Sequence, residues 1–303
     1  MSQPVASARP TQASNRRWMG MMFWLVLAGV AVLLLVSGYG ALVNADRAHL
    51  QLAVLGGLSG FGATALGAVA AIALRDISAR TQDTMLGFAA GMMLAASSFS
   101  LILPGIEAAR QLSGNPLLAA GIVVLGLGLG VALMIGLDRF VPHEHTESGR
   151  RGPEVERINR VWLFVLAITL HNLPEGMAIG VSFANGDMQV GLPLTTAIAI
   201  QDIPEGLAVA LALRVTGISA LRAAMIAIAS GLMEPVGAVV GLGISSSFAL
   251  GYPIALGLAA GAMIFVVSHE VIPETHRNGH ETPATLGLML GFGVMMFLDT
   301  ALG

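Results

Sequence analysis

The sequence predicts an all-α polytopic membrane protein, and three observations support this fold class. The chain of 303 residues is 55% hydrophobic, with a mean hydropathy of +0.79. Only 11% of its residues are charged, less than half of the roughly 25% typical of soluble domains. Its apolar residues gather in runs of about 20, the length that a helix needs to cross a bilayer. We therefore expect the lipid bilayer to surround most of the chain.

Nine apolar runs predict about nine transmembrane helices. They lie at 18–43, 50–74, 84–109, 116–138, 161–184, 191–213, 220–244, 250–272 and 284–302. Barrel strands would show alternating polarity over about ten residues, and no such segments occur. The first run could instead be a signal peptide, but its apolar core of about 19 residues exceeds the usual 7–15. We expect a tail at 1–17, a first helix at 18–43 and eight further helices over 50–302.

The distribution of arginine predicts the orientation, since the chain has no lysine. If nine spans alternate, Arg47 and Arg110 lie on one side of the membrane and all other arginines lie on the opposite side. The positive-inside rule then places the N-terminus in the cytoplasm and the C-terminus outside. In a bacterium this membrane would be the inner, plasma membrane. The longest inside loop, at about 139–160, carries His143 and His145.

Charge and cysteine content exclude several functions. A net charge of −3 gives no electrostatic support for a nucleic-acid partner. The chain has no cysteine, so it can form neither disulfides nor thiolate metal sites. Any metal site must use His, Asp, Glu, Asn, Gln or Met.

Several ionisable residues lie deep within the predicted spans: His171, Glu175, Asp202, Glu205 and Glu234. A charge at the bilayer centre costs about 2.5–3.5 kcal/mol on insertion scales. Every arginine falls in a loop or at a helix end, so none can neutralise these acids. The carboxyls must be protonated or neutralised by an external cation, and both interpretations imply cation handling. The alternative is that each acid is an incidental, protonated and hydrogen-bonded core residue.

Two adjacent spans carry related motifs. Residues 171–176 read His-Asn-Leu-Pro-Glu-Gly, and residues 201–206 read Gln-Asp-Ile-Pro-Glu-Gly. Because positions i and i+4 share a helix face, the first and fifth side chains of each motif point the same way. The second residues, Asn172 and Asp202, lie one step round the helix. The prolines should interrupt both helices at membrane depth, which is tolerated only against protein or a polar cavity.

The ligand types favour zinc over other divalent ions. Imidazole with carboxylate suits Zn²⁺ and also accommodates Fe²⁺, Mn²⁺ and Cd²⁺. An oxygen-only magnesium or calcium site would not need His171. Two carboxylates able to bridge permit a centre of two metal ions. A proton or monovalent-cation pathway, in which the acids titrate without metal, is the alternative function.

At these motifs the chain resembles the ZIP family of zinc- and iron-regulated transporter-like proteins, particularly its bacterial members. The resemblance implies an eight-helix core, uptake of divalent metal into the cytosol and a homodimer. It implies a first site of His171, Glu175, Gln201 and Glu205, with Met93 as a soft ligand unless it is a core methionine. It implies a neighbouring site of Asn172, Asp202 and Glu234 that shares Glu175 and Glu205. Many relatives have histidine in place of Gln201 and lysine in place of Asp202; aspartate permits the second site, where lysine would cancel it.

Polar residues near the span ends suggest a route for the ion, although such residues are often merely solvated. Glu107 and Asp299 fall near outer ends and form a candidate entrance. The candidate exit residues at or beyond inner ends are Asp83, Asp138, His143, His145, His269 and Glu270. A divalent ion entering at about 100 mV, inside negative, gains about 4.6 kcal/mol.

The chain shows no signature of an enzyme. The segment from His269 to Pro273 has proline where the HExxH motif of a metalloprotease needs its second histidine. No GxxxxGK[ST] phosphate loop is present, so ATP is not expected to drive transport.

Overall fold

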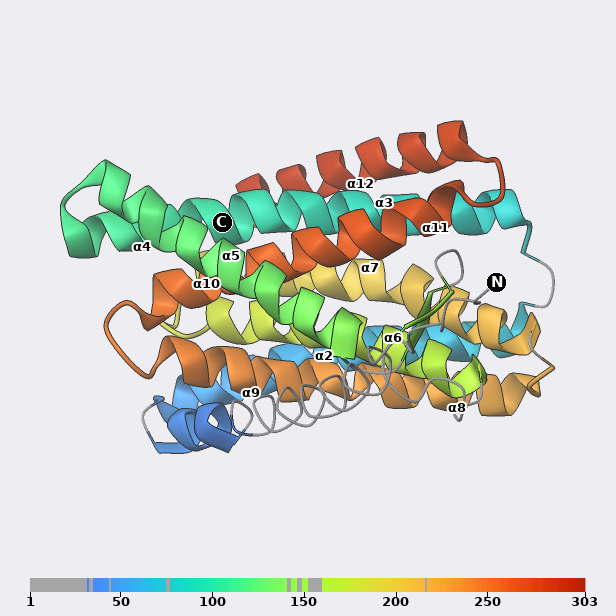
Figure 1. The fold of residues 1–303 in the computed structure, drawn as a ribbon, viewed down its shortest axis with the longest axis horizontal. Coiled ribbons are helices and arrows are strands. Elements are labelled where there is room, and N and C mark those ends of the chain that lie inside the picture. Colours follow the sequence, from blue (N-terminus) through green and yellow to red (C-terminus); the bar gives the residue numbers. More distant parts are fainter. Residues whose placement is uncertain are drawn as a thin grey trace, which may run out of the picture.

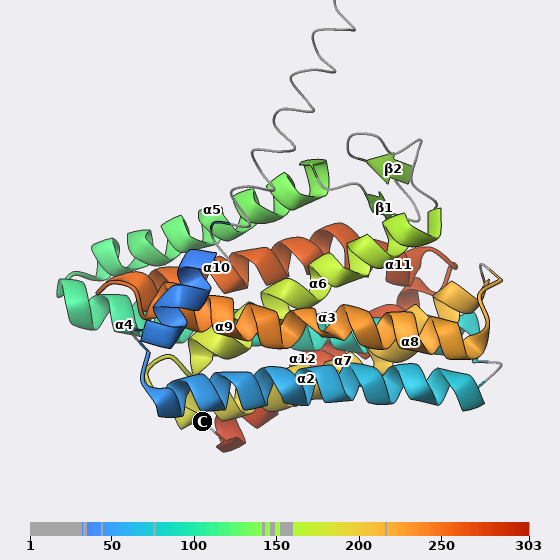
Figure 2. The ribbon, with the colours of Figure 1, turned by 90° about the horizontal axis from the view of Figure 1, so that it is seen from below.

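The computed structural model describes residues 32, 35–43, 45–74, 77–140, 143–145, 149–151, 160–215 and 217–302. Almost all of them lie in helices that run roughly along one long axis (Figures 1 and 2). The two short strands β1 (His143–His145) and β2 (Gly149–Arg151) form an antiparallel hairpin at one end of this bundle. The prediction of an all-α membrane protein is confirmed.

Seven described segments are long and apolar enough to cross a membrane. An eighth long helix, α6, spans Arg160–Ser182 and carries the first motif. The helix expected at 18–43 falls largely outside the described residues, of which 35–43 are helical. The total of nine spans therefore stays a prediction.

The other elements keep close to the predicted runs, and several extend beyond them. In chain order they are α2 (Arg47–Ala73), α3 (Ala79–Ala96), the π-helical η1 (Ser97–Ile102), α4 (Leu103–Ser113), α5 (Pro116–Phe140), α7 (Met188–Val215), α8 (Ala220–Gly231), α9 (Met233–Ser245), α10 (Gly251–Val266), the π-helical η3 (Val267–Val271), α11 (Ile272–His276) and α12 (Glu281–Leu302). Side chains cap the N-termini of some helices. Asp46, the residue before α2, accepts a hydrogen bond of 2.8 Å from the Ala48 amide. Gly114, at φ 63°, ends α4 in the left-handed region that glycine tolerates.

Prolines interrupt the helices at places other than those expected. Both α6 and α7 continue as helices through Pro174 and Pro204, so the predicted breaks in the motif helices are wrong. Transmembrane helices tolerate proline because neighbouring helices and local adjustment re-satisfy the backbone. The irregular turns instead precede Pro104 and Pro273, where η1 and η3 widen the helix. A third irregularity separates α8 from α9 at Leu232.

Glycines bring the helices together in four close pairs: α2 with α7, α3 with α12, α5 with α10, and α6 with α9. Both members of each pair contribute. A Cβ at Gly91 would overlap the Leu288 carbonyl oxygen, and one at Gly291 would overlap that of Phe88. The same reciprocity holds for Gly130 with Gly261, for Gly180 with Gly241, and for Gly67 with Gly206. Small residues allow such close backbone approach in lipid.

Candidate metal centre

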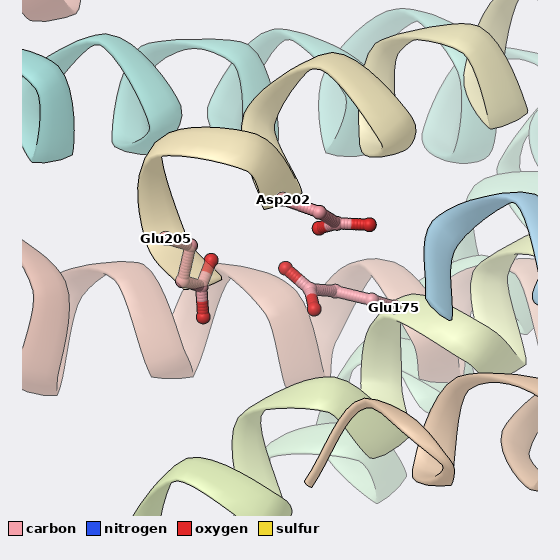
Figure 3. A group of neighbouring side chains, drawn as sticks. All are labelled: Glu175, Asp202 and Glu205. Carbon is pink, nitrogen blue, oxygen red and sulfur yellow. The ribbon is translucent and has the colours of Figure 1, made fainter. Parts of the chain in front are cut away.

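Three of the predicted carboxylates meet between α6 and α7. One ligand oxygen from each of Glu175, Asp202 and Glu205 lies within 4.8 Å of the others. Figure 3 shows the Glu175 and Asp202 carboxylates facing one another, with Glu205 one turn further along α7. Carboxylate oxygens at this separation could contact one or two cations.

The centre is sealed from solvent on most sides. Glu175 is fully buried and Asp202 is 1% exposed, whereas Glu205 is half-buried. Gln201 is also fully buried, and its Nε2 donates to Glu175 Oε1 at 2.9 Å. Because the amide nitrogen is engaged, Gln201 Oε1 is the atom that remains available as a ligand.

Glu234 joins the group from α9, where it is the second residue of the helix. Its side chain is fully buried, and its Oε1 accepts a hydrogen bond from Thr64 Oγ1 on α2 at 2.8 Å. A Cβ at Gly60, one turn before Thr64, would overlap Glu234 Oε2 and lie 3.1 Å from Asp202 Oδ2. The carboxyl groups of Glu234 and Asp202 are therefore neighbours around Gly60.

Unsatisfied polar atoms mark this centre. In the part of the chain that the structure describes, six buried side-chain atoms lack a hydrogen-bond partner. Five of them belong to the predicted ligands: Asn172 Nδ2, Glu175 Oε2, Gln201 Oε1, Asp202 Oδ2 and Glu234 Oε2. Most buried polar atoms in folded proteins are hydrogen-bonded, so this cluster of exceptions marks a candidate ligand-binding site. Four of the five are oxygens, which are suitable ligands for a divalent cation, and those of Asp202 and Glu234 belong to neighbouring carboxyl groups.

Two further predicted ligands have no described contact with this group. The backbone of His171 belongs to α6, but its side chain lies outside the described residues. Met93 is buried on α3, and its carbonyl accepts from Ser97 Oγ. Their roles as ligands stay predictions.

The residues of the candidate entrance differ in their surroundings. Asp299 accepts from Ser100 Oγ at 2.6 Å, which joins α12 to η1. Glu107 is exposed on α4 and accepts from Gln111 at 3.3 Å on the same helix.

The candidate exit residues are spread more widely. Asp83 is 2% exposed and is hydrogen-bonded to Asn278 and His280, so it is not a solvated helix end. His269 and Glu270 lie in η3, about two turns before the helical segment ends at His276. The helix continues past Pro273, an early residue of α11, and the exit role of both residues stays a prediction. The side chains of Asp138, His143 and His145 lie outside the described residues.

Sequence reasoning missed Thr64 and Gly60, which hold Glu234. Both lie on α2, a glycine-rich helix, and small residues of this kind in a membrane helix ordinarily indicate close helix packing. Their spacing of four residues places them on one face of α2, which was the available signal. No local pattern indicates that this face meets a residue 170 positions later.

The fold and this centre define an integral membrane protein with a group of carboxylates inside its helical bundle that could hold a metal ion. The sequence model of the family described as ZIP Zinc transporter matches residues 141–299, which include both motifs. The protein named Zinc transporter ZIPB from Bordetella bronchiseptica is 71% identical over 91% of this chain and 89% of its own. Zinc transporter GufA from Myxococcus xanthus is 45% identical over 80% of this chain and 95% of its own. Human Zinc transporter ZIP11 is 32% identical over 83% of this chain and 97% of its own.

The chain belongs to the ZIP family, as the two motifs predicted. Its members are metal-ion transporters, which points away from an enzyme. The family and the apolar helices together identify a membrane protein with metal-ion substrates.

Proposed function

We propose that this protein carries Zn²⁺ across the plasma membrane into the cytosol through a centre of two adjacent metal positions. The relatives named above are all called zinc transporters, which supports zinc as the transported ion. The combination of imidazole, amide and carboxylate ligands also suits zinc.

The observation that carries the proposal is the group of buried carboxylates, Glu175, Asp202 and Glu234, that lie together inside the helical bundle. Glu175, Asp202 and Glu234 each present an oxygen that no described hydrogen bond satisfies. Residues 161–213 and 223–276 contain no arginine or lysine. Burying several like charges is costly unless an opposite charge compensates them. A permeating divalent cation supplies two positive charges at the required place.

The two motifs supply the ligands of two positions that share Glu175 and Glu205. The first position takes His171 and Gln201, with Met93 as a soft ligand. The second takes Asn172, Asp202 and Glu234. The ion would move inward along the membrane potential, which favours a divalent cation by about 4.6 kcal/mol at 100 mV. Glu107 and Asp299 would receive it outside, and the inner polar residues would release it.

Proteoliposome transport tests this function. Glu175→Gln and Glu205→Gln keep the side-chain shape but remove a charge, and each is expected to lower zinc uptake by at least about tenfold. Glu281→Gln, on the exposed start of α12, is the charge-matched control and should retain uptake. Normal uptake in both motif variants would refute the centre.

Parallel flux measurements separate this function from its alternative. Zinc, cadmium, iron and manganese are compared with proton and potassium flux in the same vesicles. A proton or potassium flux without any metal flux would favour a pathway of titrating carboxylates. The dimer implied by the family resemblance stays a prediction, to be checked by the mass of the purified protein.

A further inference from the structure

We propose that the face of α2 formed by Gly60 and Thr64 positions Glu234 for the second metal position and leaves it one oxygen for the metal. The inference rests on the two-position centre of the proposed function. It gives a role in that centre to α2, a helix without a carboxylate of its own between Arg47 and Ala73.

Thr64 fixes one end of the Glu234 carboxylate. The threonine is 6% exposed, and its hydroxyl donates to Oε1 at 2.8 Å in a buried contact between α2 and α9. The other oxygen, Oε2, has no hydroxyl or amide donor among the described residues and lies beside the carboxyl group of Asp202, the neighbouring ligand of the second position. A ligating carboxylate commonly has such an outer hydrogen bond, which orients it toward the metal.

Gly60 makes room for the free oxygens. A methyl group there would overlap Glu234 Oε2 and lie 3.1 Å from Asp202 Oδ2. Thr64 follows one turn later on the same helix face. A side chain at position 60 would therefore displace the Glu234 carboxylate, because its Oε2 occupies the space that a methyl group would fill.

The backbone of Glu234 is held as firmly as its side chain. A Cβ at Gly176 would overlap the Glu234 carbonyl oxygen, so α6 lies directly against this peptide. A Cβ at Gly57 would lie 2.7 Å from the Cα of Pro235, so α2 also lies against the next residue. With the backbone held by two helices, the direction of the carboxylate is set by its side-chain contacts, the Thr64 hydroxyl at Oε1 and the Asp202 carboxyl beside Oε2.

The arrangement also bears on ion selectivity. With Oε1 engaged by Thr64, Oε2 is the oxygen of Glu234 left for the metal, and binding through one oxygen suits the four or five ligands that Zn²⁺ takes. A carboxylate with both oxygens free can bind through both, as it does with larger cations that take six to eight ligands. Thr64 therefore favours zinc over the larger Cd²⁺ at the second position.

Equilibrium dialysis of the full chain in detergent tests the role of Thr64. The wild type is expected to bind two zinc ions. Thr64→Val should lower the affinity for the second zinc ion by about 10–100-fold and leave the affinity for the first unchanged. It should also raise the ratio of cadmium to zinc affinity at the second position. Thr64→Ser, which keeps the hydroxyl, should restore both values and shows that the effect is not a general loss of folding.

The possible failures are distinguishable. A wild type that binds a single zinc ion would refute the two-position centre, whatever Thr64 does. If the wild type binds two ions but Thr64→Val binds the second ion with unchanged affinity, the role of Thr64 is overturned. The same holds if Thr64→Ser lowers the affinity for the second ion as much as Thr64→Val does. An unchanged cadmium-to-zinc ratio would overturn the single-oxygen geometry.

A second pair of variants tests Gly60 with a matched control. Gly60→Ala places a methyl group among the ligand oxygens and should lower the affinity for the second zinc ion, as Thr64→Val does. Gly62→Ala, on the same helix, meets no atom within 4 Å and should bind two ions normally. Equal binding by the two variants would overturn the role of Gly60.

Discussion

At the residue scale, the buried acids described in this protein differ in whether both carboxylate oxygens or only one has a hydrogen-bond partner. Asp83 has a partner on each oxygen: Asn278 Nδ2 at 3.0 Å and His280 Nδ1 at 2.7 Å. Glu175 and Glu234 each have a partner on one oxygen and none described on the other. A fully satisfied carboxylate holds structure together, whereas a half-satisfied one is prepared for a ligand.

The Asp83 contacts lead to a stability prediction. Asp83→Ala removes the buried acceptor that ties α3 to Asn278 and His280 in the turn before α12, so we expect unfolding to become easier by about 1–3 kcal/mol. Denaturant unfolding in micelles measures this change. Glu274→Ala is the control, because its pair with Arg277 at 3.1 Å is more than one-third exposed on both sides and should contribute less than about 1 kcal/mol. Equal effects of the two variants would contradict a structural role for Asp83.

At the scale of elements, glycine determines how closely the helices approach, and two of the prolines, Pro104 and Pro273, follow irregular π turns. The α3–α12 pair illustrates the first effect, since Gly91 and Gly291 each lie against a carbonyl oxygen of the other helix. The segment before Pro273 illustrates the second: the Ile272 amide bonds to Val267 in a π turn, and the helix then continues. Such widened turns are frequent at functional sites, and this one contains His269 and Glu270.

Two alanine substitutions on α12 separate helix packing from helix propensity. Gly291→Ala should destabilise the protein by about 1–3 kcal/mol, because its methyl group would overlap the Phe88 carbonyl oxygen. Gly293→Ala meets no atom within 4 Å and should be neutral or slightly stabilising, since alanine is the better helix former. Unfolding in micelles measures both, and equal stability would argue against the glycine-mediated contact.

At the scale of the whole molecule, the charged residues predict which side of the membrane each loop occupies. The connection between α9 and α10 is expected outside, and the start of α12 is expected in the cytoplasm. This orientation makes the inward direction of transport the one that the membrane potential favours.

The absence of cysteine makes this orientation directly measurable. Ala249→Cys and Glu281→Cys each introduce a single thiol at an exposed position. In intact cells a membrane-impermeant maleimide should label the first and not the second, while both should react after the cells are opened. Labelling of the second alone in intact cells would reverse the topology.

The sequence by itself determined the fold class, the family and the residue types of the centre. Hydropathy and the i, i+4 spacing are local properties, so they survive without knowledge of the fold. They did not indicate that α6 and α7 remain helical through their prolines, because backbone repair depends on neighbouring helices. Only the tertiary structure could bring Thr64 and Gly60 to Glu234, since packing between α2 and α9 joins residues about 170 positions apart.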